Sequence, residues 1–540
     1  METFDYIIVG GGTAGCVLAN RLTASGKHSV LLLEAGGEPK SPWIDMPAGF
    51  SKLLTNHRYN WRFNTEPEAN TLGRTIAVPR GKGLGGSTLI NGMIFVRGQP
   101  GDFDAWADAG ATGWHYAQVE PYFRKIETYS GGGVHRGRTG PMRVVPVKER
   151  YPVTQAFLEA GQNWGLPLNE DYNGPSQEGV GYYQANQHKG RRFSAYHAYL
   201  KPIRHRANLK ITTHAHVLGL DIEARQCRGL RFEVRGEVRE VRARQCVILS
   251  AGAIQSPQLL ELSGIGRPDV LAQAGIQTKH VLNGVGENYI DHFCTRMNWR
   301  LKGLSTLNEM TRDWRLLVAL LHYVTKGSGF LTLGTGLVNG FVKTRSEMTT
   351  PDVQFFFMHA SYANAAERIL DRQPGMTLGV SQMRPTSAGS IHVHSNDPKA
   401  APRIRPNFLS TTVDQEALIR GMQIGRQIVQ TEPLRRYLVQ EVSPGEQVQS
   451  DEQWLQFARE NGQTIYHPIG TCKMGEDAQA VVDSRLRVHG MDGLRVVDAS
   501  VMPSMVSGNI QAAVMMLAER ASDLILQDAE QAASTRPAVA

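Results

Sequence analysis

The chain has 540 residues, more than one compact core usually spans, and its 41% hydrophobic and 20% charged residues are typical of a soluble globular enzyme with two or more closely packed domains. The net charge of +8 is mild and the basic residues are scattered, without a dense basic run or an aromatic ladder, so nucleic acid is not expected as a partner. Five widely spaced cysteines, with no leader before the first expected strand, predict a cytoplasmic protein with neither a disulfide framework nor a metal site.

The first forty residues have the pattern of a dinucleotide-binding unit. An apolar run, Tyr6–Val9, leads into Gly10-x-Gly12-x-x-Gly15, and a helix-like segment then connects to a second apolar run that ends at Glu34. Gly10 allows a tight turn, Gly12 lets the backbone approach a pyrophosphate at the helix N-terminus, and Gly15 permits close helix packing. Glu34 is placed to accept hydrogen bonds from an adenosine ribose, which disfavours NADP and leaves NAD and FAD open.

A glycine-rich stretch follows a segment, Pro42 to Pro79, that we expect to be loop. Arg80 to Asn91 contains four glycines and breaks every periodicity, so it is either a flexible loop or backbone laid against a ligand. Its exit into the apolar run Met93–Val96, rather than into polar linker, favours the ligand-bound alternative.

The middle of the chain alternates between helix and strand patterns. Helices are expected at 115–127 and 153–164, and strands over 209–250, ending in Val247–Gly252. That last run resembles a buried strand whose carboxyl end faces a ligand. An apolar segment around Leu316–Leu321 is too short to span a membrane, and we expect a buried helix there, with a membrane-surface contact as the alternative.

The C-terminal part repeats the alternation. Strands are expected within 352–410, a helix over 414–431, a strand at Leu494–Asp498 and a last helix to about Gln527, followed by a disordered tail from 528 to 540. We therefore predict an α/β fold with a discontinuous, Rossmann-like dinucleotide domain (1–160, 205–300 and 460–527) and a strand-rich α+β substrate domain (161–204 and 301–459).

Five long motifs together resemble the glucose–methanol–choline (GMC) oxidoreductase family, nearest to its choline dehydrogenase and acceptor-linked alcohol dehydrogenase branch. The resemblance spans roughly residues 3 to 525. The motifs are Gly81–Asn91 continuing to Phe95, Gly98 and Asp104; Gly252–Gly266; Gly284–Asn288 with Asp291-His292; Tyr466–Gly475; and Asp498–Ser500 through Gly508–Gln511.

The resemblance implies FAD, with its flavin buried between the two domains. The residues it places at the cofactor are Gly10, Gly12, Thr13, Ala14, Gly15, Glu34, Ala35, Gly81, Gly85, Gly86, Ser87, Asn91, Gly92, Met93, Val217, Ala251, Gly252, Asp498, Ala499, Asn509 and Gln511. Some choline oxidases attach FAD through a histidine just before the asparagine. This chain has Ile90 there, which carries no nucleophile, so non-covalent FAD is expected.

Two residues are the candidates for chemistry. Alcohol oxidation requires removal of the hydroxyl proton, stabilisation of the developing alkoxide and a hydride acceptor, which FAD supplies. Histidine titrates near neutral pH and suits the first role, so His467 is the predicted base. Asn509, which opens a helix after Gly508, is the predicted donor to the substrate oxygen, and it can also serve as a helix N-cap.

Other histidines and Cys472 are weaker candidates. His392 and His394 share one face of an expected strand without a third metal ligand, and His188, His214, His216 and His292 are expected to be structural, although His292 lies in a family motif. Ser87-Thr88 lacks a nucleophile-elbow context, which disfavours a hydrolase.

The predicted reaction is oxidation of a primary alcohol to an aldehyde, with electrons passed to a quinone or another acceptor. The alternatives are an oxidase that uses O₂, a flavin-containing hydroxynitrile lyase, and a non-catalytic flavin protein. Trp61, Tyr182, Tyr183 and Phe355 to Phe357 are candidates to line the substrate pocket, but no carboxylate for a quaternary ammonium can be placed. Peripheral association with the cytoplasmic membrane and the oligomeric state stay open.

Overall fold

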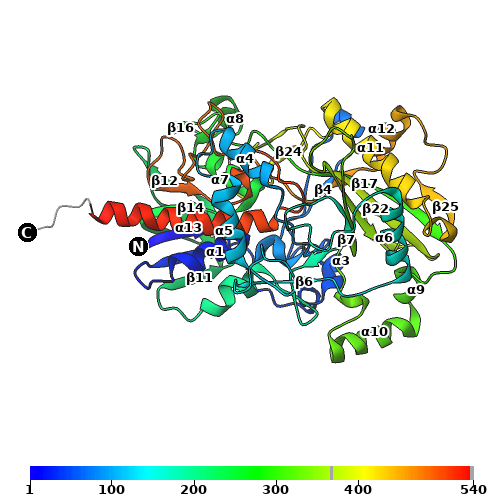
Figure 1. Ribbon diagram of the computed structural model, residues 1–540. Coiled ribbons are helices and arrows are strands. Elements are labelled where there is room, and N and C mark those ends of the chain that lie inside the picture. The colour runs from blue at the N-terminus through cyan, green and yellow to red at the C-terminus, as the bar shows by residue number, and fades with distance from the viewer. Residues whose placement is uncertain (365–368, 535–540) are drawn as a thin grey trace, which may run out of the picture.

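The computed structural model describes residues 1–364 and 369–534 and shows two lobes, each built on a seven-stranded sheet (Figure 1). In the first sheet, buried apolar runs pair in parallel around β1, and an antiparallel meander extends one edge. Its path is β11 (Leu209–Thr213), β2 (Val30–Glu34), β1 (Glu2–Val9), β14 (Glu237–Leu249), β13 (Gln226–Val234) and β12 (Ala215–Glu223), and β27 (Leu494–Val496) pairs with β14.

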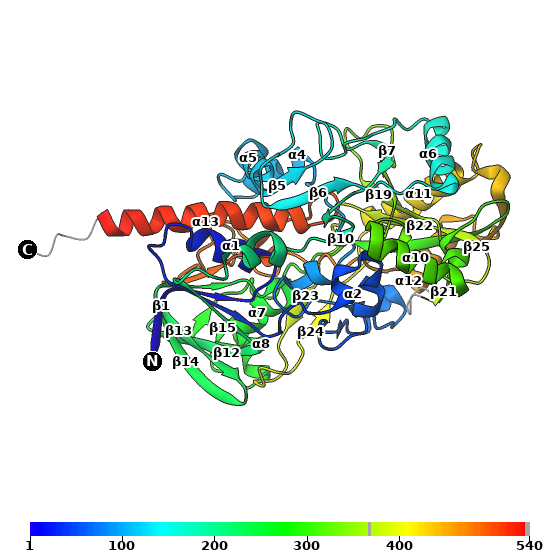
Figure 2. The same cartoon turned by 90° about the horizontal axis from the view of Figure 1, so that it is seen from below.

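Helices from distant parts of the chain pack beside this sheet. Helix α1 (Thr13–Leu22) contacts α13 (Gln511–Ser534), and α13 in turn contacts α5 (Tyr116–Ile126), so the two ends of the chain meet in one layer (Figure 2). Helix α7 (Gly252–Leu262) contacts β12 instead. The parallel strands with a crossover helix confirm the predicted α/β class and its discontinuous, Rossmann-like half.

The second sheet is antiparallel and has helices on one face. Its order is β25 (Leu438–Ser443), β17 (Phe293–Leu301), β22 (Gly375–Gln382), β19 (Val353–Met358), β18 (Val338–Val342) and β7 (Gly179–Tyr182), and β26 (Gln463–Thr464) pairs with β17. Helix α11 (Thr412–Val429) packs on β22 and β19, flanked by α6 (Pro152–Trp164) and α12 (Asp451–Asn461). Side chains alternate along β19: Phe355 and Phe357 enter the core under α11, whereas Phe356 faces the other way.

The remaining elements lie outside the two large sheets and the helices already described. The helices are α2 (Pro42–Asp45), α3 (Phe50–Leu53), α4 (Pro100–Asp108), α8 (Pro268–Gln273), α9 (Leu307–Met310) and α10 (Asp313–Lys326). The short strands are β3 (Phe63–Asn64), β4 (Ala77–Val78), β5 (Glu127–Tyr129), β6 (Met142–Pro146), β8 (Gln184–Ala185), β9 (Gln187–His188), β10 (Arg191–Arg192), β15 (Ile265–Gly266), β16 (His280–Val281), β20 (Tyr362–Asn364), β21 (Ile369–Leu370), β23 (Ser390–His392) and β24 (Arg403–Arg405). The segment from Pro42 to Pro79 therefore contains short helices and a strand pair, not loop alone.

The predicted domain boundaries cut through elements of the second layer. Helix α6 crosses residue 160, β17 crosses residue 300, and β26 lies beyond residue 460, yet all three pack with the second sheet. These boundaries depend on tertiary contacts that local patterns do not report, and the domain limits stay a prediction.

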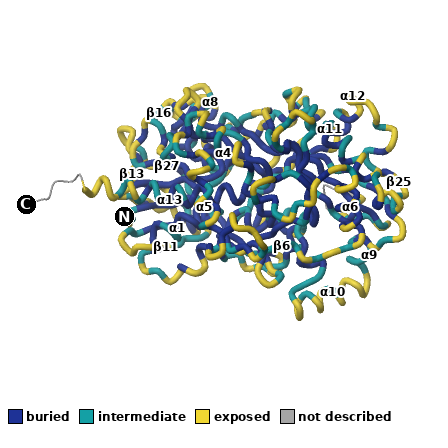
Figure 3. The backbone as a smooth tube through the Cα atoms, in the orientation of Figure 1, coloured by how far each residue is buried: buried dark blue, intermediate teal, exposed yellow. Residues whose placement is uncertain are grey.

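Two expectations about helices are wrong. Helix α13 continues through residue 528 to Ser534; Asp528 forms ion pairs with Arg485 and Arg495, whereas residues 530–534 are exposed and extend beyond the first lobe, and residues 535–540 of the predicted tail lie outside the described part. Helix α10 is not buried: none of its residues is buried, and it projects from the second lobe (Figure 3). Only one of its sides, which includes Ala319 and Tyr323, packs on the core.

Candidate functional site

A cavity of about 320 Å³ lies between the two sheets. The carboxyl ends of β1, β2 and β14 border it on one side, where ligands bind in open α/β sheets. The face of the second sheet that carries Phe356 borders the other side, with Met358 and Thr377 on neighbouring positions. A ligand in this cavity would therefore contact both layers.

The glycine turn after β1 has room only for glycine at two positions. A Cβ at Gly15 would lie 1.9 Å from the Gly10 carbonyl oxygen, and a Cβ at Gly10 would lie 2.5 Å from the carbonyl oxygen of Ser250. At Gly12, which lines the cavity, the nearest atom to a Cβ would be 3.9 Å away. Helix α1 begins at Thr13 without a side-chain cap, so the free N–H groups of its first turn are suited to a phosphate.

Glu34 is buried and organises the backbone around it. Its Oε2 accepts the N–H of Gly11 at 2.8 Å, and its Oε1 accepts the N–H groups of Gly36 at 2.8 Å and Gly83 at 2.9 Å. Burial raises the pKa of this carboxyl group, and the three N–H donors counteract the rise. Glu34 thus ties the glycine turn to the glycine-rich stretch while it also lines the cavity where the ribose contact is predicted.

The glycine-rich stretch contacts the start of α13, and both border the cavity. Asn91 donates to Gln511 Oε1 at 2.5 Å, and its own Oδ1 accepts from Arg192 at 2.8 Å and from the Met93 N–H at 3.2 Å. Ser87 Oγ accepts from Arg80 at 2.8 Å. These bonds hold backbone against the cavity, as the ligand-bound alternative for this stretch predicts.

Most predicted cofactor residues line this one cavity. They are Gly10, Gly12, Thr13, Glu34, Ala35, Gly81, Gly86, Ser87, Asn91, Gly92, Met93, Val217, Ala251, Gly252, Asp498, Ala499, Asn509 and Gln511. Ala14, Gly15 and Gly85 do not border it; Gly85 instead donates its N–H to the Gly11 carbonyl oxygen and shapes the turn from behind. The glycine turn, the uncapped N-terminus of α1 and the second-sheet wall fit an extended dinucleotide such as FAD.

The two predicted catalytic side chains meet at the cavity. Asn509 Nδ2 lies 3.2 Å from His467 Nε2, although 41 residues separate them in the chain. His467 Nδ1 lies 3.0 Å from Nδ1 of His292, a residue expected to be only structural. His292 Nε2 lies 2.8 Å from the carbonyl oxygen of Met383.

These contacts determine which nitrogen of His467 is free. The Met383 carbonyl can only accept, so His292 carries its proton on Nε2, and burial lowers the pKa of His292 to about 4, which keeps it neutral with a bare Nδ1. His467 must then donate from Nδ1, which leaves its Nε2 unprotonated and facing the Asn509 amide.

A second chain of hydrogen bonds leads to the same arrangement. Tyr183 donates to the Phe355 carbonyl, so its oxygen accepts from Gln354 Nε2 at 3.0 Å. The same Gln354 group donates to Asn509 Oδ1 at 3.3 Å. Because Oδ1 of Asn509 faces a donor, its Nδ2 faces His467 Nε2. The two chains of hydrogen bonds therefore place a proton acceptor, His467 Nε2, beside an N–H donor, Asn509 Nδ2.

Burial and charge keep His467 neutral. Burial, then the neighbouring His292 and Arg80, lower the pKa of His467 well below its ordinary value. Asp291 accepts the His467 backbone N–H at 2.8 Å and the Thr464 hydroxyl, and burial raises the pKa of Asp291 to about 6. The imidazole is therefore available as a base over the whole neutral range.

Several other candidates take structural positions. Cys472 is buried, and burial raises the pKa of its thiol well above the ordinary value, so it is no tuned nucleophile. His392 bonds Glu261 at 2.7 Å and Glu287 at 3.2 Å, and the described residues include no group of ligands that could hold a metal ion. Trp61 and Phe356 line the cavity, whereas Tyr182, Tyr183, Phe355 and Phe357 do not.

Sequence reasoning missed three supporting residues. Asp291 and His292, just before β17, and Gln354, on β19, orient the predicted pair. The Asp291-His292 dipeptide lies in one of the five family motifs, and this was the signal from which its role could have been predicted. Gln354 lies in an ordinary strand pattern and carried no signal.

Comparisons with known proteins match most of the chain. Family models described as GMC oxidoreductase match residues 4–294 and 385–518. An oxygen-dependent choline dehydrogenase of Photobacterium profundum is 39% identical and covers 99% of this chain and 95% of its own, and an alcohol dehydrogenase (acceptor) of Pseudomonas putida is 38% identical over 98% and 97%. A solved formate oxidase of Aspergillus oryzae RIB40, studied for FAD modification, superposes with a TM-score of 0.91 at 26% identity and covers 98% of this chain and 99% of its own.

Proposed function

Because the chain belongs to the GMC oxidoreductase family and is an FAD-dependent alcohol-oxidising enzyme, we propose that it oxidises a primary alcohol to an aldehyde with His467 as the base. The observation that carries this proposal is the contact between the unprotonated Nε2 of His467 and the Asn509 amide, 3.2 Å apart at the cavity.

The two side chains divide the work on the hydroxyl group. An alcohol oxygen that contacts both side chains donates its proton to His467 Nε2 and accepts a hydrogen bond from Asn509 Nδ2, which stabilises the developing alkoxide. His292 keeps the proton of His467 on Nδ1, and Gln354 keeps the amide of Asn509 turned toward the substrate. When bound, FAD supplies the hydride acceptor.

We propose that the cofactor is held without a covalent bond. Ile90 lines the cavity at the position where some relatives carry an attaching histidine, and its aliphatic side chain cannot form such a bond. Non-covalent contacts would come from the backbone N–H groups at the start of α1, from the glycine-rich stretch and from the other predicted cofactor residues that line the cavity. Mild acid precipitation should release all of the flavin into the supernatant.

The electron acceptor is proposed to be a quinone or another organic acceptor, with O₂ as the second candidate. Anaerobic mixing with a panel of primary alcohols is expected to bleach the yellow absorbance of the enzyme, because the base and the amide are already in place. Admission of air then separates the acceptors: slow return of the colour supports a dehydrogenase, and return within the mixing time supports an oxidase. A protein that no alcohol bleaches would contradict the proposed reaction.

We further propose that α10 attaches the protein to the surface of an anionic membrane. Trp314, Leu317, Leu321 and Val324 form an outward stripe at helical spacing and are 66%, 69%, 66% and 73% exposed. No described helix is both long and apolar enough to cross a bilayer, so α10 would lie in the interface.

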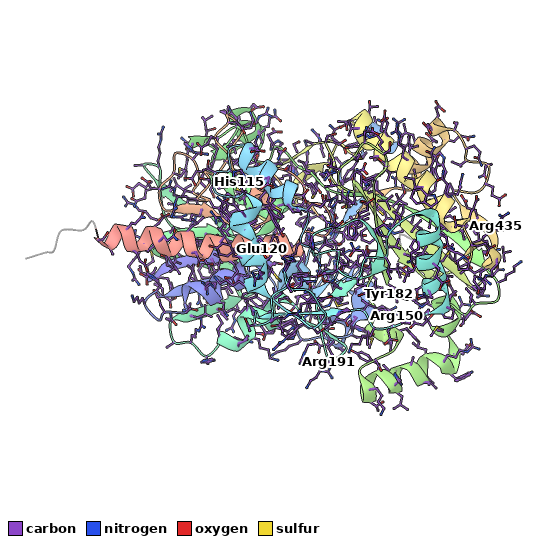
Figure 4. All side chains as sticks on the ribbon, in the orientation of Figure 1. His115, Glu120, Arg150, Tyr182, Arg191 and Arg435 are labelled. Atoms are coloured by element: carbon purple, nitrogen blue, oxygen red, sulfur yellow. The ribbon has the colours of Figure 1, made fainter. Side chains whose placement is uncertain are left out.

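Charge next to this stripe favours lipid over a second copy of the chain. Arg315 and Lys326 follow one flank of the stripe, and Arg191, labelled in Figure 4, interacts with Tyr323 of the helix. Basic residues beside an apolar stripe are attracted to anionic headgroups. A helix of 14 residues offers a footprint of only roughly 200 Å² (about 21 Å by 10 Å), whereas a stable protein interface needs about 800 Å² per partner.

Vesicle flotation tests this surface. The protein is expected to float with phosphatidylcholine vesicles that contain phosphatidylglycerol and to float less with phosphatidylcholine alone. The double substitution Leu317→Glu and Leu321→Glu should abolish flotation, whereas Val238→Glu, at a 60% exposed valine in the first lobe, should not. If the double variant instead changes the molar mass in solution and the unaltered protein does not float, a second copy covers α10 and the lipid proposal fails.

A further inference from the structure

A cationic side chain lies in the second-sheet wall of the cavity. Arg296 on β17 pairs with Gly379 of β22, which pairs with Phe356 of β19. Because paired residues project to the same face of a sheet, these three positions face the same way, and all three border the cavity. Gly379 contributes no side chain between the guanidinium and the ring.

The guanidinium group has no counter-charge within the described residues. None of them forms an ion pair or a hydrogen bond with Arg296, and its Nη1 is buried without a partner. The carboxylates among the described cavity residues are Glu34 and Asp498, and both belong to the dinucleotide side. Glu34 is held by three backbone N–H groups, and Asp498 accepts from the Gly252 N–H and the Ser256 hydroxyl.

An unpaired guanidinium in the wall of a cavity indicates what the cavity binds. A partly buried charge is costly unless it is paired, and arginine forms its strongest pairs with carboxylates, through two parallel hydrogen bonds. A quaternary ammonium requires the opposite: an aromatic cage and a carboxylate. We propose that Arg296 binds a carboxylate of the substrate, so that the preferred alcohols are hydroxy acids and choline-like cations are disfavoured. This inference rests on the alcohol oxidation proposed above.

The positions of the two ends define the shape of the substrate. Arg296 is four residues beyond His292 on the same segment, a separation on the order of 13 Å along an extended strand. His292 contacts His467, so the reacting hydroxyl group and the carboxylate are bound at separate places. Phe356, Met358 and Ile465 border the same cavity with apolar surface. A hydroxy acid with an aromatic ring or several methylene groups between its two ends fits this spacing.

The test compares a charged substrate with a neutral one of the same shape. The rates at which limiting 4-(hydroxymethyl)benzoate and 4-(hydroxymethyl)benzamide bleach the flavin under anaerobic conditions give kcat/KM for each. The benzoate is expected to be preferred by roughly 10- to 100-fold, as a hydrogen-bonded charge pair implies. Arg296→Gln should abolish this preference by lowering kcat/KM for the benzoate while leaving kcat/KM for the benzamide unchanged. Lys302→Gln removes the same charge from an exposed position at the end of β17 and should preserve the preference.

A binding measurement separates this inference from the proposed reaction. Titration of the oxidised enzyme with 4-methylbenzoate, which has no hydroxyl group, should perturb the flavin spectrum, and Arg296→Gln should weaken that binding by a similar factor. If neither alcohol bleaches the flavin but the anion still binds through Arg296, the proposed reaction fails and the anion site stands. Equal use of the benzoate and the benzamide, or unchanged anion binding in Arg296→Gln, overturns the inference.

Discussion

His467→Ala is expected to bind a full complement of FAD and to lose alcohol-dependent bleaching by about 10²- to 10⁴-fold, the usual contribution of a positioned base. The loss follows because Nε2 of His467 is the unprotonated acceptor beside Asn509. Stopped-flow reduction under anaerobic conditions measures the rate, and the flavin-to-protein absorbance ratio measures cofactor content. His394→Ala, at an exposed histidine, is the control and should leave both values unchanged.

The pH dependence of the reduction rate checks the same assignment. A base must be neutral to accept a proton, and burial, His292 and Arg80 hold the pKa of His467 well below its ordinary value. The rate should therefore not fall as the pH decreases through about 6.5, the ordinary value for histidine. A fall near pH 6 would report Asp291, whose pKa burial raises to about 6, and Asp291→Asn should remove it. A fall that persists in that variant and follows an ordinary histidine would contradict the assignment.

Glu34→Ala is expected to yield a largely colourless protein that does not take up added FAD. The substitution removes the predicted ribose contact and leaves the N–H groups of Gly11, Gly36 and Gly83 without their acceptor. A buried donor without a partner costs about 1–3 kcal/mol. The backbone that lines the cofactor cavity therefore loses its internal support. Flavin content after purification and isothermal titration with FAD measure the effect.

Two variants make the result interpretable. Glu38→Ala removes a nearby carboxylate that pairs with Arg204 at the surface and should retain FAD. Glu34→Gln keeps one oxygen acceptor and should bind FAD weakly but measurably, with circular dichroism like that of the unaltered protein. Full flavin content in Glu34→Ala would exclude a role for Glu34 in cofactor binding.

Local motifs predicted the dinucleotide half well, because its geometry depends on short-range constraints. The turn after β1 requires glycine where a Cβ would meet backbone oxygen, and such a requirement is visible in the residues themselves. The helices at 115–127, 153–164 and 414–431 appear as α5, α6 and α11 within a few residues, since their apolar spacing follows the helical period.

The spacing of apolar residues did not predict whether helix α10 is buried. Helix α10 has apolar residues on two sides, and its spacing does not tell which side meets the core. Only the structure shows that Ala319 and Tyr323 pack inward while Trp314 and Leu321 remain exposed. The domain boundaries depend on tertiary contacts for the same reason. The local pattern of α6 or of β17 is the same whichever of the two sheets the element packs with.

By itself, the sequence determined the cofactor class and the fold class and proposed His467 and Asn509 as the reacting pair, because those inferences depend on residue types at fixed spacing. Only the tertiary structure showed which nitrogen of His467 is unprotonated, and that Arg296 lies in the cavity wall without a counter-charge among the described residues. The tautomer of His467 depends on hydrogen-bond partners such as His292 and Met383. Whether Arg296 has a counter-charge depends on all of its described neighbours. In both cases the neighbouring residues come from distant parts of the chain.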